Sequence, residues 1–322
     1  MRQAALALVL LALVALPPLA EPYILHVAIV VLINVVYAEG LYVIMRMGYL
    51  SFGHAGYIAL GAYTSALLST ELGVSVWLGF PAGGLVAALF AWALGAVTLK
   101  LRGIYFSLSV FAFAEVVSAA FRAFDVFGGP AGIAGVPRPM FLGTRLNTHL
   151  GFYYVVLVTA LVSLVFLYRL GATRFGFTLL SLRTRHTEIL AESVGIDAAR
   201  YKTLAFVISC FFCGLMGAVH GHYLRFVSPF VFTFFLSTDL VIYNMVGGLG
   251  SFWGPLVGSV LLTALGEQLF AAGYYKSLVY AVVLLVVILA LPGGLIQITR
   301  AREMGAARRL GWGKAPVTTA ER

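Results

Sequence analysis

Long apolar runs of about 20 residues recur along almost the whole chain, separated by short polar segments. A run of this length crosses a bilayer as a helix, whereas the strands of a membrane barrel would be shorter and would alternate apolar and polar residues. The pattern therefore predicts an all-α polytopic membrane protein with about ten transmembrane helices. The expected spans are 4–20, 24–45, 51–69, 77–99, 104–124, 152–169, 203–224, 235–250, 253–270 and 277–291.

Clustered glycines interrupt the apolar pattern at two places, residues 46–68 and residues 243–265. Each segment contains a Ser-Phe pair, and an acidic residue precedes that serine by twelve positions, Glu39 in one case and Asp239 in the other. Interrupted helices in both halves of a transporter can line its translocation pathway. Glycines also allow helices simply to pack closely. The sequence leaves both interpretations open.

The chain contains few charged residues, and they are unevenly distributed along the sequence. Only 10% of the residues are charged, against about 25% in soluble domains, and the net charge is +9. Lysine and arginine concentrate at 100–102, 169–202 and 300–322. Short basic segments remain in the cytoplasm, so we interpret this charge as a topology signal and expect no nucleic-acid partner. Segment 125–150, rich in glycine and proline, then falls outside the cell.

These signals define the expected organisation. Residues 1–298 are expected to form a transmembrane domain with a cytoplasmic loop at about 170–202, and residues 299–322 a basic cytoplasmic tail. Both termini are expected in the cytoplasm. The first 20 residues resemble a signal peptide, but Pro18 makes a poor cleavage site after Ala20, so we expect a retained helix.

The cytoplasmic loop contains a short amphipathic helix. Thr184 is a plausible N-cap, and Ile189, Leu190 and Val194 form an apolar stripe at helical spacing. Gly195 fits a left-handed C-cap, after which Ile196 is expected to fold back onto Leu190. Asp197 is then expected to cap the next membrane helix. The predicted helix covers about ten residues.

A helix this short is marginal in water, so its apolar stripe needs a partner. Lipid headgroups or a groove on another protein would both serve. A membrane-surface helix usually carries several bulky apolar residues and a broad basic face. The apolar face of this helix is small, and the helix contains Glu188 and Glu192. We therefore favour a protein groove.

Polar residues at membrane depth are candidates for transport. Ionisable groups there are costly and often functional. The candidates for the pathway are His54, Glu115, Asp239, Asn244 and Trp253. For His54 a hydrogen bond between helices is the alternative role. Glu115 shares a helix face with Arg122, seven residues later, and its alternative role is a structural hydrogen bond or ion pair between helices.

The remaining motifs indicate no chemistry. Cys210 and Cys213 lie in an apolar helix, where they are expected to pack. His220 and His222 have no third or fourth ligand nearby, so no metal site, cofactor or catalytic group is expected. The G-x-x-x-x-G-K-[ST] phosphate-binding loop does not occur in the sequence. If ATP drives this protein, a partner must hydrolyse it.

Several motifs resemble the LivM-type permeases of bacterial branched-chain amino acid ABC importers. In the C-terminal half these are "AESVGIDAARYK", "HYLRFVSPFVF" and "GGLGSFWGPLVGSVLLTALGE". In the N-terminal half they are "GYLSFGHAGYIALGAYTSALL", "LRGIYFSLSVFAFAEVV" and the external "GGPAGIAGVPRP". The resemblance covers nearly the whole chain in the order of the family.

The resemblance implies a subunit of the bacterial inner membrane that forms the translocation pathway for branched-chain or related amino acids. It implies four kinds of partner: a second, LivH-type permease, two cytoplasmic ATPase subunits, an extracytoplasmic substrate-binding protein and the lipid bilayer. The short cytoplasmic helix would couple to the ATPase. The residues implied at that contact are Glu188, Leu190, Glu192, Gly195 and Ile196.

The sequence departs from the family pattern at two places. Arg46 precedes Met47-Gly48 where smaller or apolar residues are usual, and "RTRHTEIL" is more basic than typical. Two other functions remain alternatives: the same importer class carrying urea, amides or another small polar solute, and a secondary transporter or channel that works alone. The last would need no coupling helix.

Overall fold

A computed structural model describes residues 21–101, 103–141, 144–145 and 148–269, together with 13–15, 17, 20, 278, 281–282, 285, 289 and 294–296. Within these residues, five helices are long and apolar enough to cross a membrane: α2 (Pro22–Met45), α4 (Val76–Thr98), α5 (Ile104–Ala123), α6 (His149–Gly171) and α9 (Ala198–Leu224). Three shorter helices are α3 (His54–Thr70), α10 (Phe234–Gly247) and α11 (Trp253–Gln268).

These eight helices match eight of the predicted spans in order, so the helical class is confirmed. The prediction of about ten transmembrane helices is not confirmed, because α3, α10 and α11 are shorter than a full crossing. The predicted spans 4–20 and 277–291 lie largely outside the described residues.

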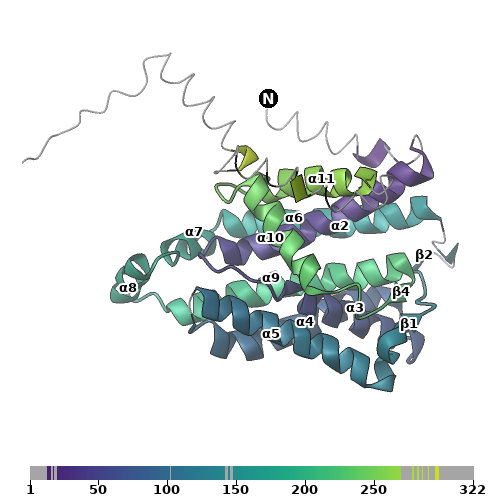
Figure 1. Cartoon of the computed structure of the whole chain (residues 1–322), viewed down its shortest axis with the longest axis horizontal. Helices are drawn as coiled ribbons and strands as arrows, with labels where there is room; N and C mark the ends of the chain where they lie inside the picture. Colours follow the sequence, from purple (N-terminus) through teal and green to yellow (C-terminus); the bar gives the residue numbers. More distant parts are fainter. Residues whose placement is uncertain are drawn as a thin grey trace, which may run out of the picture.

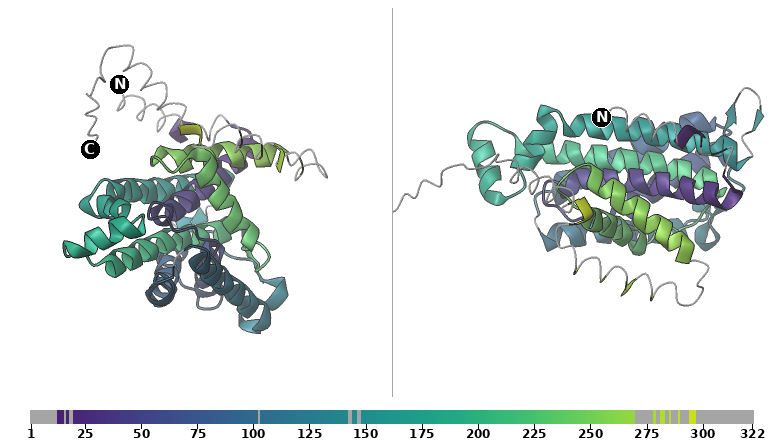
Figure 2. Two further views of the ribbon diagram at one scale, coloured as in Figure 1. Left: turned by 60° about the vertical axis from the view of Figure 1, so that its left-hand side comes forward. Right: turned by 90° about the horizontal axis from the view of Figure 1, so that it is seen from above.

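The helices lie side by side around α9 (Figures 1 and 2). Helices α2 and α6 lie on one side of α9, and α3, α4 and α5 on the other, while α11 packs against α2. The short helices α7 (Arg174–Ser181) and α8 (Arg185–Ser193) project at one end of the bundle, and the small strands lie at the opposite end. The two ends of the bundle are therefore structurally distinct.

Glycines bring the backbones of α3, α4 and α9 into direct contact. A Cβ atom on Gly61 would overlap the carbonyl group of Gly214, and one on Gly217 would overlap that of Ile58. A Cβ atom on Gly83 would come within 2.6 Å of the Gly61 carbonyl oxygen. Small residues at helix crossings are a main source of packing energy in membranes, where lipid removes the hydrophobic drive for association.

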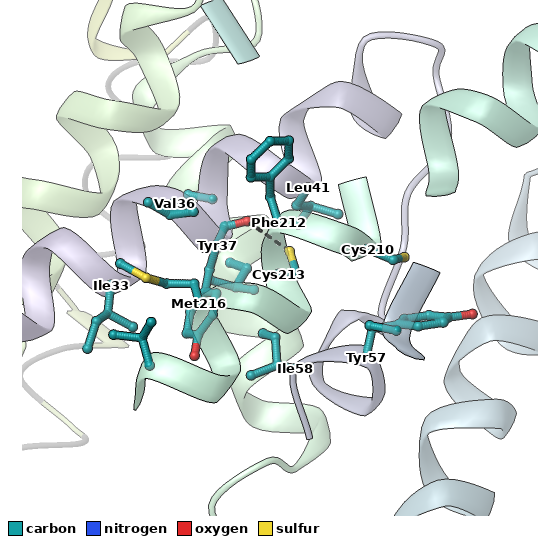
Figure 3. Packing of buried hydrophobic residues seen from close by; sticks show 14 of the residues in the cluster. Ile33, Val36, Tyr37, Leu41, Tyr57, Ile58, Cys210, Phe212, Cys213 and Met216 are labelled. Atoms are coloured by element: carbon teal, nitrogen blue, oxygen red, sulfur yellow. Dashed lines mark hydrogen bonds between the residues drawn. The ribbon is translucent and has the colours of Figure 1, made fainter. Parts of the chain in front are cut away.

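The core between α2 and α9 is apolar (Figure 3). Tyr37, Ile33 and Met216 are buried there, and the Cys213 thiol lies 3.8 Å from the Tyr37 carbonyl oxygen. Both Cys210 and Cys213 are buried and free. Both cysteines pack in the main hydrophobic core, as the sequence predicts.

A short strap ties segment 125–150 to the end of α9. It contains the 3-10 helices η1 (Asp125–Phe127) and η2 (Gly129–Ala131) and strand β1 (Ile133–Ala134), which pairs antiparallel with β4 (Phe226–Val227). Strand β2 (Met140–Phe141) pairs with β3 (Thr144–Arg145). The β1–β4 pairing joins segments about 90 residues apart, which local sequence patterns do not reveal.

Side chains reinforce the strap. His222 donates from Nδ1 to the Pro137 carbonyl at 2.5 Å, so its Nε2 accepts from the Ser65 hydroxyl at 2.8 Å. Trp77 Nε1 donates to the Met140 carbonyl at 2.7 Å. Partial burial, together with the nearby charge of Arg225, lowers the pKa of Arg138 from its usual value. This end of the bundle is therefore closely tied together.

Candidate functional site

Helix α8 begins as the sequence predicts. The Thr184 hydroxyl accepts from the backbone N–H of Thr187 at 3.3 Å, and the Thr187 hydroxyl accepts from the N–H of Thr184 at 3.2 Å. This is a capping box in which threonine replaces the usual glutamate or glutamine. The helix runs from Arg185 to Ser193, nine residues against the predicted ten or so.

The end of α8 is a tight left-handed turn. Gly195 has φ +87°, and its N–H donates to the Glu192 carbonyl at 3.0 Å. The N–H of Ile196 donates to the Ala191 carbonyl at 3.1 Å, which completes a Schellman motif. Asp197 caps α9, because its carboxylate accepts from the Arg200 N–H at 3.1 Å. The predicted cap and turn are confirmed.

Ile196 packs against a small cluster formed by Leu182, Ala191 and Ala198, separate from the main core. Ala191 is also the residue whose carbonyl accepts the N–H of Ile196, as the hydrophobic contact of a Schellman motif requires. Leu190 is 65% exposed, and a contact of Ile196 with Leu190 stays a prediction.

The apolar stripe of α8 is uncovered. Ile189 is 54% exposed, Leu190 65% and Val194 76%. Glu192 and Gly195 are also exposed, so they lie on the surface with the stripe. Two large apolar side chains on this nine-residue helix and a third at its C-cap form a surface that suits contact with a partner.

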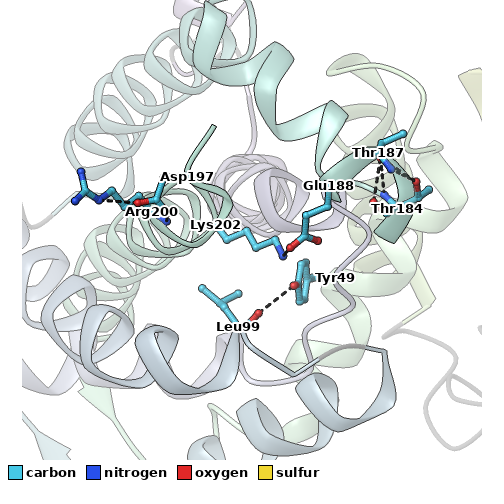
Figure 4. A network of polar contacts seen from close by, with 8 residues as sticks. All are labelled: Tyr49, Leu99, Thr184, Thr187, Glu188, Asp197, Arg200 and Lys202. Atoms are coloured by element: carbon cyan, nitrogen blue, oxygen red, sulfur yellow. Dashed lines mark hydrogen bonds and ion pairs between the residues drawn. The ribbon is translucent and has the colours of Figure 1, made fainter. Parts of the chain in front are cut away.

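Glu188 is turned toward the body of the protein, although it was implied at the partner contact. Its carboxylate lies 2.6 Å from the Lys202 ammonium group on α9, and the two residues are only 8% and 4% exposed (Figure 4). The Lys202 ammonium group also lies 5.4 Å from the centre of the Tyr49 ring. A buried ion pair of this kind fixes the orientation of α8 relative to α9, because separating the two charges would leave each of them uncompensated in a buried site.

Helix α7 was not anticipated. It covers Arg174–Ser181 and buries Leu179, and the Phe175 ring stacks on Tyr201 of α9 at 5.4 Å. The signal was present in the sequence, since Phe175, Leu179 and Leu182 repeat at intervals of four and three residues. The loop between α6 and α9 thus consists of two short helices that contact the start of α9.

The first glycine-rich segment is a real interruption, residues 46–53 between α2 and α3. His54 immediately follows it and is fully buried. The Ser209 hydroxyl donates to the Gly40 carbonyl at 2.6 Å, so it accepts from His54 Nε2 at 2.8 Å. His54 Nδ1 then accepts from the Ser51 hydroxyl at 2.9 Å. His54 therefore joins α2, α3 and α9, which supports the hydrogen-bond alternative for this residue.

The second interruption, residues 248–252, has a different geometry. Helices α10 and α11 fold directly against each other, with Gly247, Gly254 and Gly258 at their contact. Asn244 is fully buried and donates to the Ala38 carbonyl on α2 at 3.0 Å. Trp253 begins α11 and is 40% exposed. Both predicted interruptions exist, but only the second forms a close hairpin.

The acidic candidates lie apart. Glu115 on α5 and Asp239 on α10 are half-buried. Arg122, on the same helix face as Glu115, donates to Ser118, one turn away, at 3.0 Å, and the structural role of Glu115 between helices stays a prediction. Ser118 is the nearer partner along the helix, and the guanidinium group folds back to it. The five pathway candidates are therefore spread over α3, α5, α10 and α11.

Glu39, which precedes Ser51 by twelve positions, and Arg46, which departs from the family pattern, lie together near α7. Both line a cavity of about 10 Å³ beside α6 and α7, and Glu39 is fully buried. Such a volume holds about one water molecule. Within the searched part of the chain, no group of three or more metal-ligating side chains occurs.

The chain can be compared with known proteins at this point. The family model for the branched-chain amino acid transport system permease component matches residues 23–291. The high-affinity branched-chain amino acid transport system permease protein LivM of Salmonella typhimurium is 30% identical over 299 residues, 85% of this chain and 70% of the relative. LivM of Escherichia coli K12 is 30% identical over 310 residues, 88% of this chain and 72% of the relative.

A more distant relative belongs to the second type of permease. LivH of Escherichia coli K12 is 23% identical over 269 residues, 78% of this chain and 86% of the relative. No solved structure matches the chain. The family match extends over most of the chain and includes the interruptions and α8, so the chain belongs to the family of branched-chain amino acid transport system permease components.

Proposed function

We propose that this chain is the membrane permease subunit of an ATP-driven importer for branched-chain or related amino acids. Its partners would be a LivH-type permease, two cytoplasmic ATPase subunits that hydrolyse the ATP, and an extracytoplasmic substrate-binding protein. The observation that carries the proposal is the uncovered apolar stripe on α8, a rigidly capped helix at one end of the bundle. A transporter working alone has no use for such a surface.

The exposed face of α8 is the proposed ATPase contact. Leu190 and Glu192, with Ile189 and Val194, would enter a groove on the ATPase, and the Gly195 turn would set the angle of the helix. Fully burying a large aliphatic side chain stabilises a complex by about 1.5–3 kcal/mol. Glu188 and Ile196 would act from the inner face, by holding α8 against α9.

The proposed membrane topology is based on the different structures at the two ends of the helix bundle. The loop that carries α7 and α8 is basic, and such loops remain in the cytoplasm. The β1–β4 strap lies at the opposite end and would face outward, toward the binding protein. Both termini would then be cytoplasmic, in a multi-pass protein of the inner membrane.

The translocation pathway would lie along helices that retain exposed polar groups. The side-chain nitrogen atoms of His54 and Asn244 form hydrogen bonds to neighbouring helices. These two residues would therefore support the wall of the pathway without contacting the substrate. Glu115, Asp239 and Trp253 are at least partly exposed and remain the direct candidates. Substrate selection would occur mainly in the binding protein, because a pathway that held its substrate tightly would release it slowly.

Co-purification tests the proposal. The chain is expressed with the second permease and the ATPase subunits, and the complex is reconstituted with binding protein and radiolabelled leucine. Leu190→Asp is expected to abolish ATPase co-purification and ATP-dependent uptake. Leu72→Asp is the matched control, since Leu72 is 70% exposed and follows α3 at the other end of the bundle.

Two results would overturn the proposal. One is leucine uptake by the lone chain that an ion gradient drives, which indicates a secondary transporter. The other is ATP-dependent uptake in the Leu190→Asp complex equal to that of the unmodified one. Radiolabelled urea and short amides are tested as alternative cargo: if the complex takes them up with ATP and does not take up leucine, the importer class stands but the cargo is different.

A further inference from the structure

The inner face of α8 contacts its neighbours through an apolar cluster and a buried ion pair. The apolar cluster consists of Leu182, Ala191 and Ala198 and is separate from the main core. The ion pair joins Glu188 of α8 to Lys202 of α9, at 2.6 Å. Figure 4 shows the two side chains reaching toward each other between α8 and α9.

Lys202 extends this attachment to a third element. Its ammonium group lies 5.4 Å from the centre of the Tyr49 ring, a distance at which a cation is attracted to the ring face. The Tyr49 hydroxyl donates to the Leu99 carbonyl at the end of α4, at 3.1 Å, and its ring meets Phe106 of α5 edge to face at 4.8 Å. Tyr49 is 6% exposed, so it is held on several sides.

Tyr49 belongs to the interruption between α2 and α3, and its neighbours there contact other helices. A Cβ atom on Gly48 would lie 2.9 Å from the Arg183 carbonyl oxygen, just before α8. The Leu50 carbonyl accepts from Ser107 of α5 at 2.5 Å, and Ser51 donates to His54. Residues 48–51 therefore meet the cytoplasmic loop, α4, α5 and α3 in succession.

Space remains beside the ion pair. A cavity of about 180 Å³ lies between α8, the end of α4 and the start of α9, and its lining includes Lys100, Glu188, Glu192 and Lys202. Close packing would resist displacement of α8 toward α4. This cavity leaves that direction free, while the ion pair keeps α8 attached to α9.

We propose that Glu188, Lys202 and Tyr49 form a linkage that transmits displacement of α8 to the interruption between α2 and α3. They are positioning residues: they touch neither ATP nor substrate, and they act through the helices that they join. The interruption at residues 46–53 then serves as a joint between the coupling helix and the bundle. The inference rests on the proposed function, since the displacement would come from the ATPase.

The test measures the reconstituted complex in three ways: the ATPase subunits that co-purify, the rate of ATP hydrolysis, and the substrate taken up per ATP hydrolysed. Lys202→Met and Tyr49→Leu remove the two ends of the cation–ring contact. Each is expected to lower uptake per ATP about fivefold or more, while ATPase co-purification is retained. Lys100→Met is the control, because Lys100 is exposed on the same cavity.

The double variant distinguishes a linkage from two local defects. If Lys202 and Tyr49 act in one linkage, Tyr49→Leu/Lys202→Met loses no more uptake per ATP than the worse single variant. Losses that multiply would overturn the linkage, and so would unchanged uptake per ATP in both single variants. Glu188→Gln keeps the side-chain volume and an acceptor oxygen, so it repeats the test if Lys202→Met does not assemble.

The outcome for the unmodified complex separates this inference from the proposed function. If the unmodified chain does not bind ATPase subunits, the proposed function fails. If it binds them and couples ATP to uptake, and the variants couple equally well, only the linkage fails.

Discussion

Replacing Gly195 should disturb α8 through backbone strain alone. Its φ of +87° lies in the left-handed region, and a Cβ atom there would meet no other atom within 4 Å. Side-chain overlap therefore contributes nothing. An L-residue in that region costs about 1–2 kcal/mol, and this lowers the ratio of capped to frayed helix about 5- to 30-fold.

The assay compares Gly195→Val, Gly195→Ala and Gly195→Asn in the reconstituted complex. Valine, which is β-branched, should reduce ATP-dependent uptake most, and alanine less. Asparagine tolerates the left-handed region and should retain most of the uptake. Limited proteolysis of the 183–201 segment in detergent should show the same order, because fraying exposes its backbone.

The order of the three variants is the decisive result. Equal uptake and equal protease resistance in all three would show that the Schellman turn does not hold α8 in place. A loss with asparagine as large as that with valine would show instead that the side chain at position 195 meets the partner directly. All three chains are expected to insert normally, since Gly195 lies outside the membrane helices.

Three further predictions concern the stability of the bundle, measured as thermal unfolding in detergent. Gly61→Val should destabilise the bundle by about 3 kcal/mol or more, because the new side chain must displace the α9 backbone at Gly214. Gly73→Val, where a Cβ atom meets nothing within 4 Å, should cost only about 1–2 kcal/mol of strain at φ +61°. Ser209→Ala should cost about 1–2 kcal/mol, since it leaves His54 Nε2 without its acceptor; an unchanged midpoint would mean that His54 does not join the helices.

Local patterns in the sequence were enough to predict α8 and its ends. Thr184, Gly195 and Asp197 each act on a backbone within a few residues, and all three do what their types predict. The interruptions at 46–53 and 248–252 were visible for the same reason, because clustered glycines weaken a helix locally. The helical spacing of Phe175, Leu179 and Leu182 also indicates helix α7, although this helix was not predicted.

Contacts between distant segments could not be predicted. The side chain of Glu188 could face outward or inward at its place on the helix, and only the packing of α8 against α9 brings it to Lys202. His54 was recognised as polar and buried, but its acceptor, Ser209, lies 155 residues away. Arg122 had two plausible partners on its own helix, and the nearer one, Ser118, binds it.

The glycine crossing of α3, α4 and α9 bears on how the bundle can move. Helices separated by side chains can slide, because small rotamer changes absorb the shift. At Gly61 and Gly83 the nearest atoms belong to the backbone of a neighbouring helix, so no side chain there can adjust. We therefore expect these three helices to move as one rigid unit, with any bending during transport confined to the helices around them.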